Sequence, residues 1–493
     1  MLSILVCHSY YLRFDKKQLQ RAKPYPPLAT LQVAALLRKA GHRVHLFDAM
    51  LAAGVEEFEA QLAGPAPDVV LLYEDNFNFL SKMCLAQMRR ACFEMIRLAA
   101  QRGARVIAAG PDVSDAPGEY LRAGADLALL GEGLSSLLEL VLRLDTSPAA
   151  PATTLSEGLS GVATLDKGEV RLTHGDAVLP VADEPELPAW DLVDIDRYRD
   201  TWQRAHGFFS LNMAASRGCS FRCAWCAKPI WGNRYLQRTA TSVAAEMDYL
   251  RRSFAPDHIW FADDIFGMRV DWVLEFAQAA HANGGPVPFT IQTRADLISE
   301  RMAQALQGAG CKEAWIGAES GSQRVLTAMN KGTTVAELIA ARARLKRCAV
   351  RVGFFIQLGY LNEELTDILA TRRLLETARP DDIGVSVAYP LPGTKFYEQV
   401  KEQLGVKTHW HDSGDLDMMF WGTYTSDFYR VIRDLLHDQV AVEKLAEPAH
   451  EVEHRRARHL LQRRWRELLS REPAYRNHTT ATASAPGPGP LMI

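Results

Sequence analysis

The stretch RGCSFRCAWCAKP, residues 217–229, places Cys219, Cys223 and Cys226 on one short loop, and no Cys or His follows within the next twenty residues. A structural zinc site usually takes two separated pairs of ligands, so this spacing disfavours zinc. Three thiolates on one loop suit a [4Fe-4S] cluster, because soft thiolates select iron–sulfur clusters. Such a cluster keeps one iron open, which predicts a bound substrate or cosubstrate.

Short apolar runs alternate with amphipathic segments after this loop. Six runs lie between residues 206 and 400: LNMAAS, HIWFAD, VPFTIQ, EAWIGAE, RVGFFIQLG and DIGVSVAYP. Consecutive βα units of this length are typical of parallel barrels, so we predict a partial (β/α)6 barrel of the TIM type over residues 206–400. Its chemistry is expected at the carboxyl ends of the strands, where the three cysteines also fall.

The first 145 residues show the same alternation, with the runs SILV, RVHLF, DVVLLY, ARVIAAG and DLALLG. They predict an α/β domain over residues 1–145, built on an open, doubly wound, Rossmann-like parallel sheet. Ligands of such sheets bind at the carboxyl ends of the strands, near residues 8–27, 74–79, 110–112 and 131–133. The G-x-G-x-x-G turn of dinucleotide-binding domains is absent, so NAD binding is disfavoured.

The remaining segments connect or follow these domains. Residues 146–205 predict a linker with a hairpin at GVATL-DKG-EVRLT, residues 401–478 a mainly helical substrate-related region, and residues 479–493 a disordered tail. The Arg-rich segment 455–466 either meets an acidic group or forms a solvated helix face. Five aromatic residues of the helical region either grip a flat or sugar-like ligand or pack in a core: Trp410, Trp421, Tyr424, Phe428 and Tyr429.

The formal net charge of −3 over 493 residues gives no overall basic surface, so nucleic acid is not predicted as a partner. No apolar run reaches the roughly 18 residues needed to span a bilayer, and the start MLSILVCHSYY has no signal-peptide pattern. We therefore predict a cytoplasmic protein without a membrane span. The other cysteines are too scattered for a disulfide framework and are expected to be buried, inert thiols: Cys7, Cys84, Cys92, Cys311 and Cys348.

The cysteine loop resembles the C-x-x-x-C-x-aromatic-C signature of radical S-adenosylmethionine (SAM) enzymes, with Trp225 in the aromatic position. Further segments resemble this family in chain order: FADDIFG (261–267), TRADLI (293–298), IGAESGSQRVLTAMNKGTT (316–334), GFFIQLGYLNEE (353–364) and YPLPGTKFYEQV (389–400). The chain departs from the family where Leu361-Asn362 replaces the common Pro-Gly, so the shape of that loop needs the structure.

The resemblance implies that the three cysteines hold the cluster and that the open iron chelates SAM, which the reduced cluster would cleave to a 5′-deoxyadenosyl radical. The implied SAM contacts are Trp225, Asp263, Asp264, Arg294, Glu319, Ser320 and Gly359. Simpler roles compete at three positions. Asp264 and Glu319 could be helix N-caps or first-turn charges, and Arg294 could form a surface ion pair.

The N-terminal half resembles the cobalamin-binding domains that precede one branch of the radical enzymes, through YPPLATLQVAALLRKAGHRVHLFDA (25–49) and GPDVSDAPGEYLRAGADLALLGEG (110–133). The segment YEDNFNFLSKMC (73–84) could line the corrin or start a packed helix. No Asp-x-His-x-x-Gly motif supplies a lower cobalt ligand. His8 could replace it, but a lone His in a loop is usually an ordinary polar loop residue. The implied cobalamin contacts are Tyr25, Pro27, Asn76, Gly110, Asp112, Gly131, Glu132 and Gly133.

Together the two resemblances imply methylation of an unactivated carbon of a small molecule, with one SAM used for the radical and another to remethylate cobalt. A flavodoxin or ferredoxin would supply electrons. Two other functions remain open. One is cyclisation or oxidation, as in the anaerobic magnesium-protoporphyrin monomethyl ester cyclases, and the other is a non-catalytic cobalamin or redox sensor.

Overall fold

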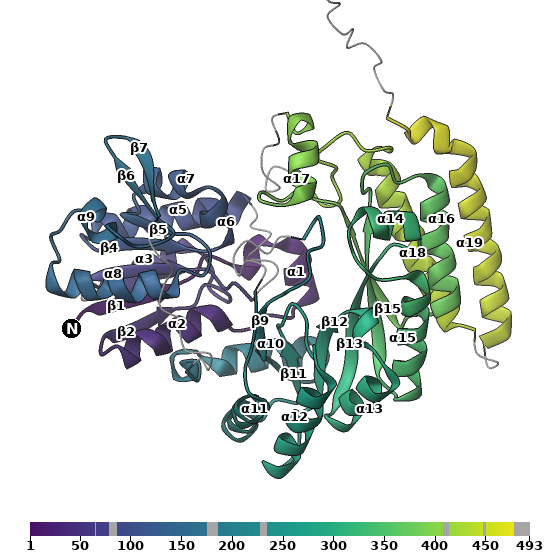
Figure 1. Ribbon diagram of the computed structural model, residues 1–493, viewed down its shortest axis with the longest axis horizontal. Helices are drawn as coiled ribbons and strands as arrows, with labels where there is room; N and C mark the ends of the chain where they lie inside the picture. Colours follow the sequence, from purple (N-terminus) through teal and green to yellow (C-terminus); the bar gives the residue numbers. More distant parts are fainter. Residues whose placement is uncertain are drawn as a thin grey trace, which may run out of the picture.

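The computed structural model describes residues 1–64, 66–77, 86–174, 186–226, 234–405, 407, 414–446 and 450–477. It holds two large sheets, the first mainly and the second entirely parallel, each covered by helices, followed by a helical C-terminal region (Figure 1). Four sequence predictions fall wholly or partly outside these residues: the inert thiol of Cys84, residues 78–84 of the segment that could line the corrin or start a helix, the ligand or core role of Trp410, and the disordered tail at 479–493.

The first sheet has seven strands in the order β2-β1-β3-β4-β5-β6-β7. Strands β1 to β5 are parallel, and their order 2-1-3-4-5 is that of flavodoxin-like doubly wound sheets, which confirms the predicted N-terminal fold. The strands are β1 (Ser3–Cys7), β2 (Arg43–Phe47), β3 (Val69–Tyr73), β4 (Arg105–Ala109), β5 (Leu127–Leu129), β6 (Val162–Asp166) and β7 (Glu169–Thr173).

Alternate residues of β1 point to opposite faces of this sheet. Ile4 and Val6 join one buried cluster, and Leu5 and Cys7 join the other. Both faces are therefore covered by helices, as a parallel sheet requires. The covering helices are α2 (Leu28–Lys39) and α8 (Leu134–Thr146) on one face, and α3 (Val55–Leu62) and α5 (Ala86–Gln101) on the other.

The predicted hairpin, β6 and β7, extends the first sheet, because β6 pairs antiparallel with β5. Helix α10 (Ile195–His206) then leads into the second sheet and buries Ile195, Tyr198 and Trp202. The shorter helices of this half are α1 (Lys16–Arg21), α6 (Pro111–Asp115), α7 (Pro117–Ala123) and α9 (Ala152–Ser156).

The second sheet has six parallel strands in the order β15-β14-β13-β12-β11-β8 and does not close, which confirms the predicted partial (β/α)6 barrel. Its strands are β8 (Ser210–Met213), β11 (His258–Phe261), β12 (Phe289–Thr293), β13 (Cys311–Glu319), β14 (Arg351–Leu358) and β15 (Asp382–Val387). Its helices are α11 (Ala240–Phe254), α12 (Val270–Ala282), α13 (Glu300–Gly308), α14 (Gln323–Ala328), α15 (Val335–Arg347) and α16 (Leu365–Ala378). A separate antiparallel pair, β9 (Ser216–Gly218) and β10 (Tyr235–Gln237), flanks the cysteine loop.

The C-terminal region consists of α17 (Lys395–Val400), α18 (Ser426–Lys444) and α19 (Glu451–Arg471). Three of its aromatic residues, Tyr424, Phe428 and Tyr429, are fully buried, so they pack in a core, whereas Trp421 is exposed. Most arginines of α19 lie on an exposed face. Among the described residues, no helix combines the length and apolar character needed to cross a bilayer.

Segment 24–27, which precedes α2, joins the two halves of the molecule. Trp202 Nε1 donates to the carbonyl of Pro24 at 2.7 Å, and Asn212 Nδ2 donates to that of Pro26 at 3.0 Å. The hydroxyl of Tyr25 lies 3.1 Å from Ser210 Oγ on the first strand of the partial barrel. The segment after β1 therefore packs directly against the second sheet.

Candidate functional site

The cysteine loop lies beyond the carboxyl end of β8 and directly after β9. Cys219 is buried, whereas Cys223 and Cys226 are half-buried. The loop is tied to the partial barrel by its own backbone, since Ala224 N donates to Met329 O at 2.8 Å and the amide of Phe396 donates to Ala224 O at 2.9 Å.

Three thiolates on an anchored loop fit a [4Fe-4S] cube. No three His, Cys, Asp or Glu side chains converge on a single-ion position within the described part of the chain. A cube needs no such group, because each thiolate binds a different iron. Trp225, between two of the cysteines, has a buried indole Nε1 without a hydrogen-bond partner, and such an orphaned donor fits a cosubstrate that supplies an acceptor beside the loop.

Asp263, a predicted SAM contact, points back into the protein. Its Oδ2 accepts the backbone NH of Ala215 at 3.0 Å, and its Oδ1 accepts the hydroxyl of Ser216. Burial raises the pKa of Asp263 to about 7, although these two hydrogen bonds oppose the rise. Asp263 therefore holds the turn between β8 and β9, while the neighbouring Asp264 is half-buried.

Glu319 ends β13 with a φ of +59°, a left-handed conformation that is uncommon outside glycine. Its carboxylate pairs with Lys331 Nζ at 2.7 Å, and the two side chains are 5% and 7% exposed. Glu319 caps no helix, because the N-cap of α14 is Ser322. The carboxylate is thus a buried, paired charge at a strand end, and removing Lys331 would leave it uncompensated.

The two residues after Glu319 pack against α16. Ser320 is fully buried, and its Oγ lies 3.2 Å from Thr371 Oγ1. The backbone NH of Gly321 donates to the same hydroxyl at 2.9 Å. A Cβ atom on Gly321 would lie 2.6 Å from backbone atoms of both Ala370 and Thr371, so this position has room only for glycine.

Leu361 and Asn362 form a tight turn at the place where the family commonly has Pro-Gly. The backbone NH of Glu363 donates to the carbonyl of Tyr360 at 3.0 Å, which closes a four-residue turn. Asn362, the third residue, has a φ of +56°, as in a type II turn, and Asn tolerates this conformation well. Leu361-Asn362 therefore forms the kind of turn that a Pro-Gly pair also favours.

Glu363 is a fully buried carboxyl group beneath this turn. Its Oε2 accepts the backbone NH of Gly359 at 2.6 Å, while Oε1 is buried without a partner. Burial raises the pKa of Glu363 to about 8. A Cβ on Gly359 would lie 2.9 Å from Met418 Sδ and 3.1 Å from Tyr429 Cζ, so the C-terminal region covers this strand end.

We expect Glu363→Gln to flatten the pH dependence of folding stability. The carboxyl pKa is about 8 in the folded protein. It is about 4.3 in an unfolded chain, so the folded state binds more protons and the free energy of unfolding falls as pH rises from about 5 to 8. Gln keeps an acceptor for the Gly359 NH without a charge, which removes a fall of about 2–4 kcal/mol. Denaturant unfolding at several pH values measures this fall in the free energy of unfolding. The same pH dependence of that free energy in the wild type and in Glu363→Gln would contradict the prediction.

Arg294 is 3% exposed, so its ion pair with Asp296 is largely buried and does not lie on the open surface. Its guanidinium contacts Asp296, the carbonyl of Lys331, the ring of Phe221 and the sulfur of Cys223. These partners surround it within the protein.

The carboxyl edge of the first sheet carries three glycines from the predicted cobalamin set. A Cβ on Gly110 would lie 2.7 Å from Glu74 Cβ, so the strand end approaches its neighbour closely. Gly131 and Gly133 are left-handed, with φ of +68° and +64°, and shape the turn between β5 and α8. Such glycine turns let the backbone come close to a ligand.

The polar residues of the predicted cobalamin set differ in whether their side chains already have hydrogen-bond partners within the protein. Asn76 is 1% exposed, and its Oδ1 is buried without a partner. Asp112 is held by Arg89 through two contacts of 2.7 Å and by the hydroxyl of Tyr120, so its carboxylate is committed within the domain. Pro27 is the N-cap of α2, and Tyr25 contacts Ser210 as described above.

Glu132 joins this edge to the cysteine loop. Its Oε1 lies 2.7 Å from Arg217 Nη1, and Arg217 Nη2 also donates to Gln32 Oε1 at 2.9 Å. Arg217 stands two residues before Cys219. The carboxyl edges of the two sheets therefore meet through a partly buried ion pair beside the cysteine loop.

Two family models match the chain, the radical SAM superfamily over residues 213–375 and the B12-binding domain over residues 19–141. The chain is a radical SAM protein with an N-terminal B12-binding domain. The radical SAM match runs from the end of β8 into α16, and the B12-binding match spans α1 to α8. These matches confirm the predicted family and its cofactors: a [4Fe-4S] cluster, SAM and cobalamin.

Relatives match most of this chain at low identity. An uncharacterized methyltransferase of Pyrococcus horikoshii is 24% identical over 80% of this chain and 82% of its own length. The hopanoid C-3 methylase of Methylococcus capsulatus is 25% identical over 78% and 70%. The fold resembles that of the radical SAM methyltransferase TsrM from Kitasatospora setae, with a TM-score of 0.63 and 18% identity over 81% of this chain and 74% of that one.

The B12-binding domain fits a corrin at the edge described above. Its glycine turns and the orphaned Oδ1 of Asn76 lie in loops that follow the parallel strands, where ligands of this sheet type bind. These loops, and not Asp112, offer groups that remain available for a ligand.

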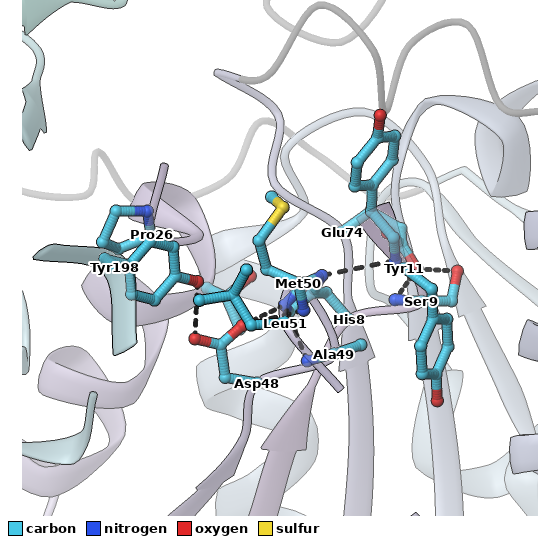
Figure 2. Close-up of polar contacts among 12 residues, drawn as sticks. His8, Ser9, Tyr11, Pro26, Asp48, Ala49, Met50, Leu51, Glu74 and Tyr198 are labelled. Carbon is cyan, nitrogen blue, oxygen red and sulfur yellow. Dashed lines mark hydrogen bonds and ion pairs between the residues drawn. The ribbon is translucent and has the colours of Figure 1, made fainter. Parts of the chain in front are cut away.

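His8, the alternative cobalt ligand, directly follows β1, and both of its ring nitrogens are engaged (Figure 2). Nε2 lies 2.9 Å from Asp48 Oδ1 and 3.1 Å from the amide of Ala49, while Nδ1 faces the amide of Tyr10 at 3.3 Å. Burial would lower the pKa of His8, but the hydrogen bond and charge of Asp48 outweigh it and raise the pKa. The hydroxyl of Tyr198 also contacts Asp48, at 2.7 Å. A metal ligand needs a free lone pair, so His8 is poorly suited to bind cobalt.

Sequence reasoning missed three polar residues of the site: Arg217, Lys331 and Glu363. All three lie inside motifs that resemble the radical SAM family, so the motifs themselves were the available signal. Spacing along the chain does not reveal that Lys331 pairs with Glu319, or that Arg217 reaches the B12-binding domain.

Proposed function

We propose that this protein methylates an unactivated carbon of a small molecule, using a [4Fe-4S] cluster, SAM and cobalamin. The observation that carries the proposal is the Arg217–Glu132 ion pair, 2.7 Å long, because it brings the cysteine loop and the cobalamin-side turn to one shared edge. Two of the methyltransferase relatives cover most of this chain, and one of these two is a hopanoid C-3 methylase.

When bound, SAM on the cluster supplies a hydrogen-abstracting radical and cobalamin supplies a methyl group. This chain's residues provide the setting. Cys219, Cys223 and Cys226 would hold the cluster, and the Glu319–Lys331 pair presents a rigid carboxylate at the end of β13. Low exposure around this pair excludes water, which protects reactive species.

We also infer that an external flavodoxin or ferredoxin reduces the protein, and that it works in the cytoplasm. None of the described cysteines forms a disulfide: Cys7, Cys92, Cys219, Cys223, Cys226, Cys311 and Cys348. Free thiols, and a cluster that must be reduced, suit a reducing compartment.

Methyl-labelled SAM tests the reaction. The reconstituted, reduced protein is incubated with a metabolite extract and SAM carrying a deuterated methyl group, and products are compared by mass spectrometry with those from unlabelled SAM. We expect a product that carries the label, together with 5′-deoxyadenosine. A changed product without label would favour cyclisation or oxidation, and absence of 5′-deoxyadenosine would favour a sensor.

A further inference from the structure

Arg294 lies between the cysteine loop and the segment after α14. Its Nη1 lies 3.7 Å from the sulfur of Cys223, and its Nη2 donates to the carbonyl of Lys331 at 2.6 Å. The ring of Phe221 covers the guanidinium, with Cζ 3.7 Å from the ring centroid. The side chain thus touches the loop at two points on either side of Arg222.

This position is dry and charged. Arg294 is 3% exposed, and guanidinium groups stay protonated in proteins, so a full positive charge faces the Cys223 sulfur with little solvent screening. Asp296 pairs with the opposite side of the guanidinium, at 3.0 and 3.2 Å, and is 23% exposed. The pair therefore forms a dipole whose positive end points at Cys223.

The same contacts argue against a SAM-binding role for this residue. Nε and Nη2 are committed to Asp296 and to the carbonyl of Lys331, and Nη1 faces the sulfur. A chelated carboxylate would have to displace these buried partners, whereas a cluster thiolate on Cys223 accepts the existing contact as it stands. Hydrogen bonds and charges near cluster sulfurs are known determinants of cluster potential.

We propose that Arg294 is a positioning residue that holds a positive charge against the Cys223 thiolate of the cluster and thereby raises its reduction potential. One-electron reduction adds a negative charge to the cluster, so a fixed cation stabilises the reduced form more than the oxidised form. Asp296 opposes this effect from behind. The proposal rests on the [4Fe-4S] assignment of the proposed function and not on methyl transfer.

The test is a redox titration of the reconstituted full-length protein without SAM or substrate, with dithionite as the electron source and the reduced cluster followed by electron paramagnetic resonance. We expect Arg294→Gln to shift the midpoint potential to more negative values and Asp296→Asn to shift it to less negative values. Arg294→Lys, which keeps the charge, should lie between wild type and Arg294→Gln. The matched control is Arg301→Gln, which removes an exposed arginine that pairs with Asp271 on the outside of the barrel and should shift nothing.

Iron and sulfide content per chain separates this role from a structural one. Lower cluster content with an unchanged potential in the remaining clusters, or equal potentials in Arg294→Gln and Asp296→Asn, would overturn the proposal. A weakened affinity for SAM with no change in potential would instead return Arg294 to the SAM site. If Arg294→Gln holds no cluster, Asp296→Asn still decides, because its expected shift has the opposite sign. Failure of methyl transfer leaves the titration unaffected.

Discussion

Replacing Cys219, Cys223 and Cys226 together by Ala is expected to abolish the iron–sulfur absorbance and to reduce 5′-deoxyadenosine formation to the level seen without protein, because only these thiolates are expected to hold the cluster on this loop. The fold should survive, since the loop is anchored by backbone hydrogen bonds from Ala224 and Phe396 and not by the thiols. Anaerobic reconstitution, iron analysis and chromatography of 5′-deoxyadenosine measure the effect.

Cys348→Ala is the matched control for this variant. Cys348 is a free thiol at the C-terminal end of α15, outside the loop, and should change neither cluster content nor SAM cleavage. SAM cleavage at the wild-type rate by the triple variant would refute the cluster assignment and with it the proposed chemistry.

Gly321→Ala is expected to destabilise the partial barrel by about 3 kcal/mol, at the upper end of overpacking effects. The added Cβ would lie 2.6 Å from backbone atoms of α16, and a backbone cannot move aside as a flexible side chain can. Shifting α16 would also disturb the hydrogen bond from Gly321 to Thr371 and the neighbouring Glu319–Lys331 pair. Thermal unfolding should show a midpoint lower by roughly 5–10 °C, with a parallel loss of SAM cleavage.

Gly308→Ala provides the comparison, because a Cβ at Gly308 meets nothing within 4 Å at the end of α13. Ala favours helix over Gly, so this variant should be unchanged or more stable by up to about 1 kcal/mol. Equal midpoints for the two variants would show that α16 yields to the added carbon and that Gly321 is not required by packing.

Local patterns predicted the elements well. The βα alternation gave both parallel sheets, and GVATL-DKG-EVRLT gave the hairpin β6–β7, because strands and tight turns depend on neighbouring residues. The linker prediction did not anticipate that this hairpin extends the first sheet, since strand pairing with β5 depends on tertiary packing. From the sequence, the aromatic residues of the C-terminal region could either bind a ligand or pack in a core. The burial of Tyr424, Phe428 and Tyr429 shows that these three pack in a core.

Some features of the candidate site could also be predicted from local sequence, whereas others needed the tertiary structure. The cluster loop could be predicted because its three ligands lie within eight residues of the chain. The turn at Leu361-Asn362 needed the structure, in which Asn362 has the left-handed conformation that Gly also adopts. His8 could not be judged from sequence, since its bonds to Asp48 and Ala49 join residues about forty positions apart.

The sequence by itself determined three features: the three thiolates that can hold a cluster, the glycine turns at the strand ends, and the order of the two domains. Only the tertiary structure decided how the charges are used. Arg217 pairs with Glu132, which lies 85 positions away in the sequence. Lys331 pairs with Glu319 at the end of β13. Arg294, a candidate for a surface ion pair in the sequence, is a buried cation beside Cys223. The physical reason is that spacing encodes geometry only over a few residues, whereas the pairing and desolvation of charges depend on which elements pack together.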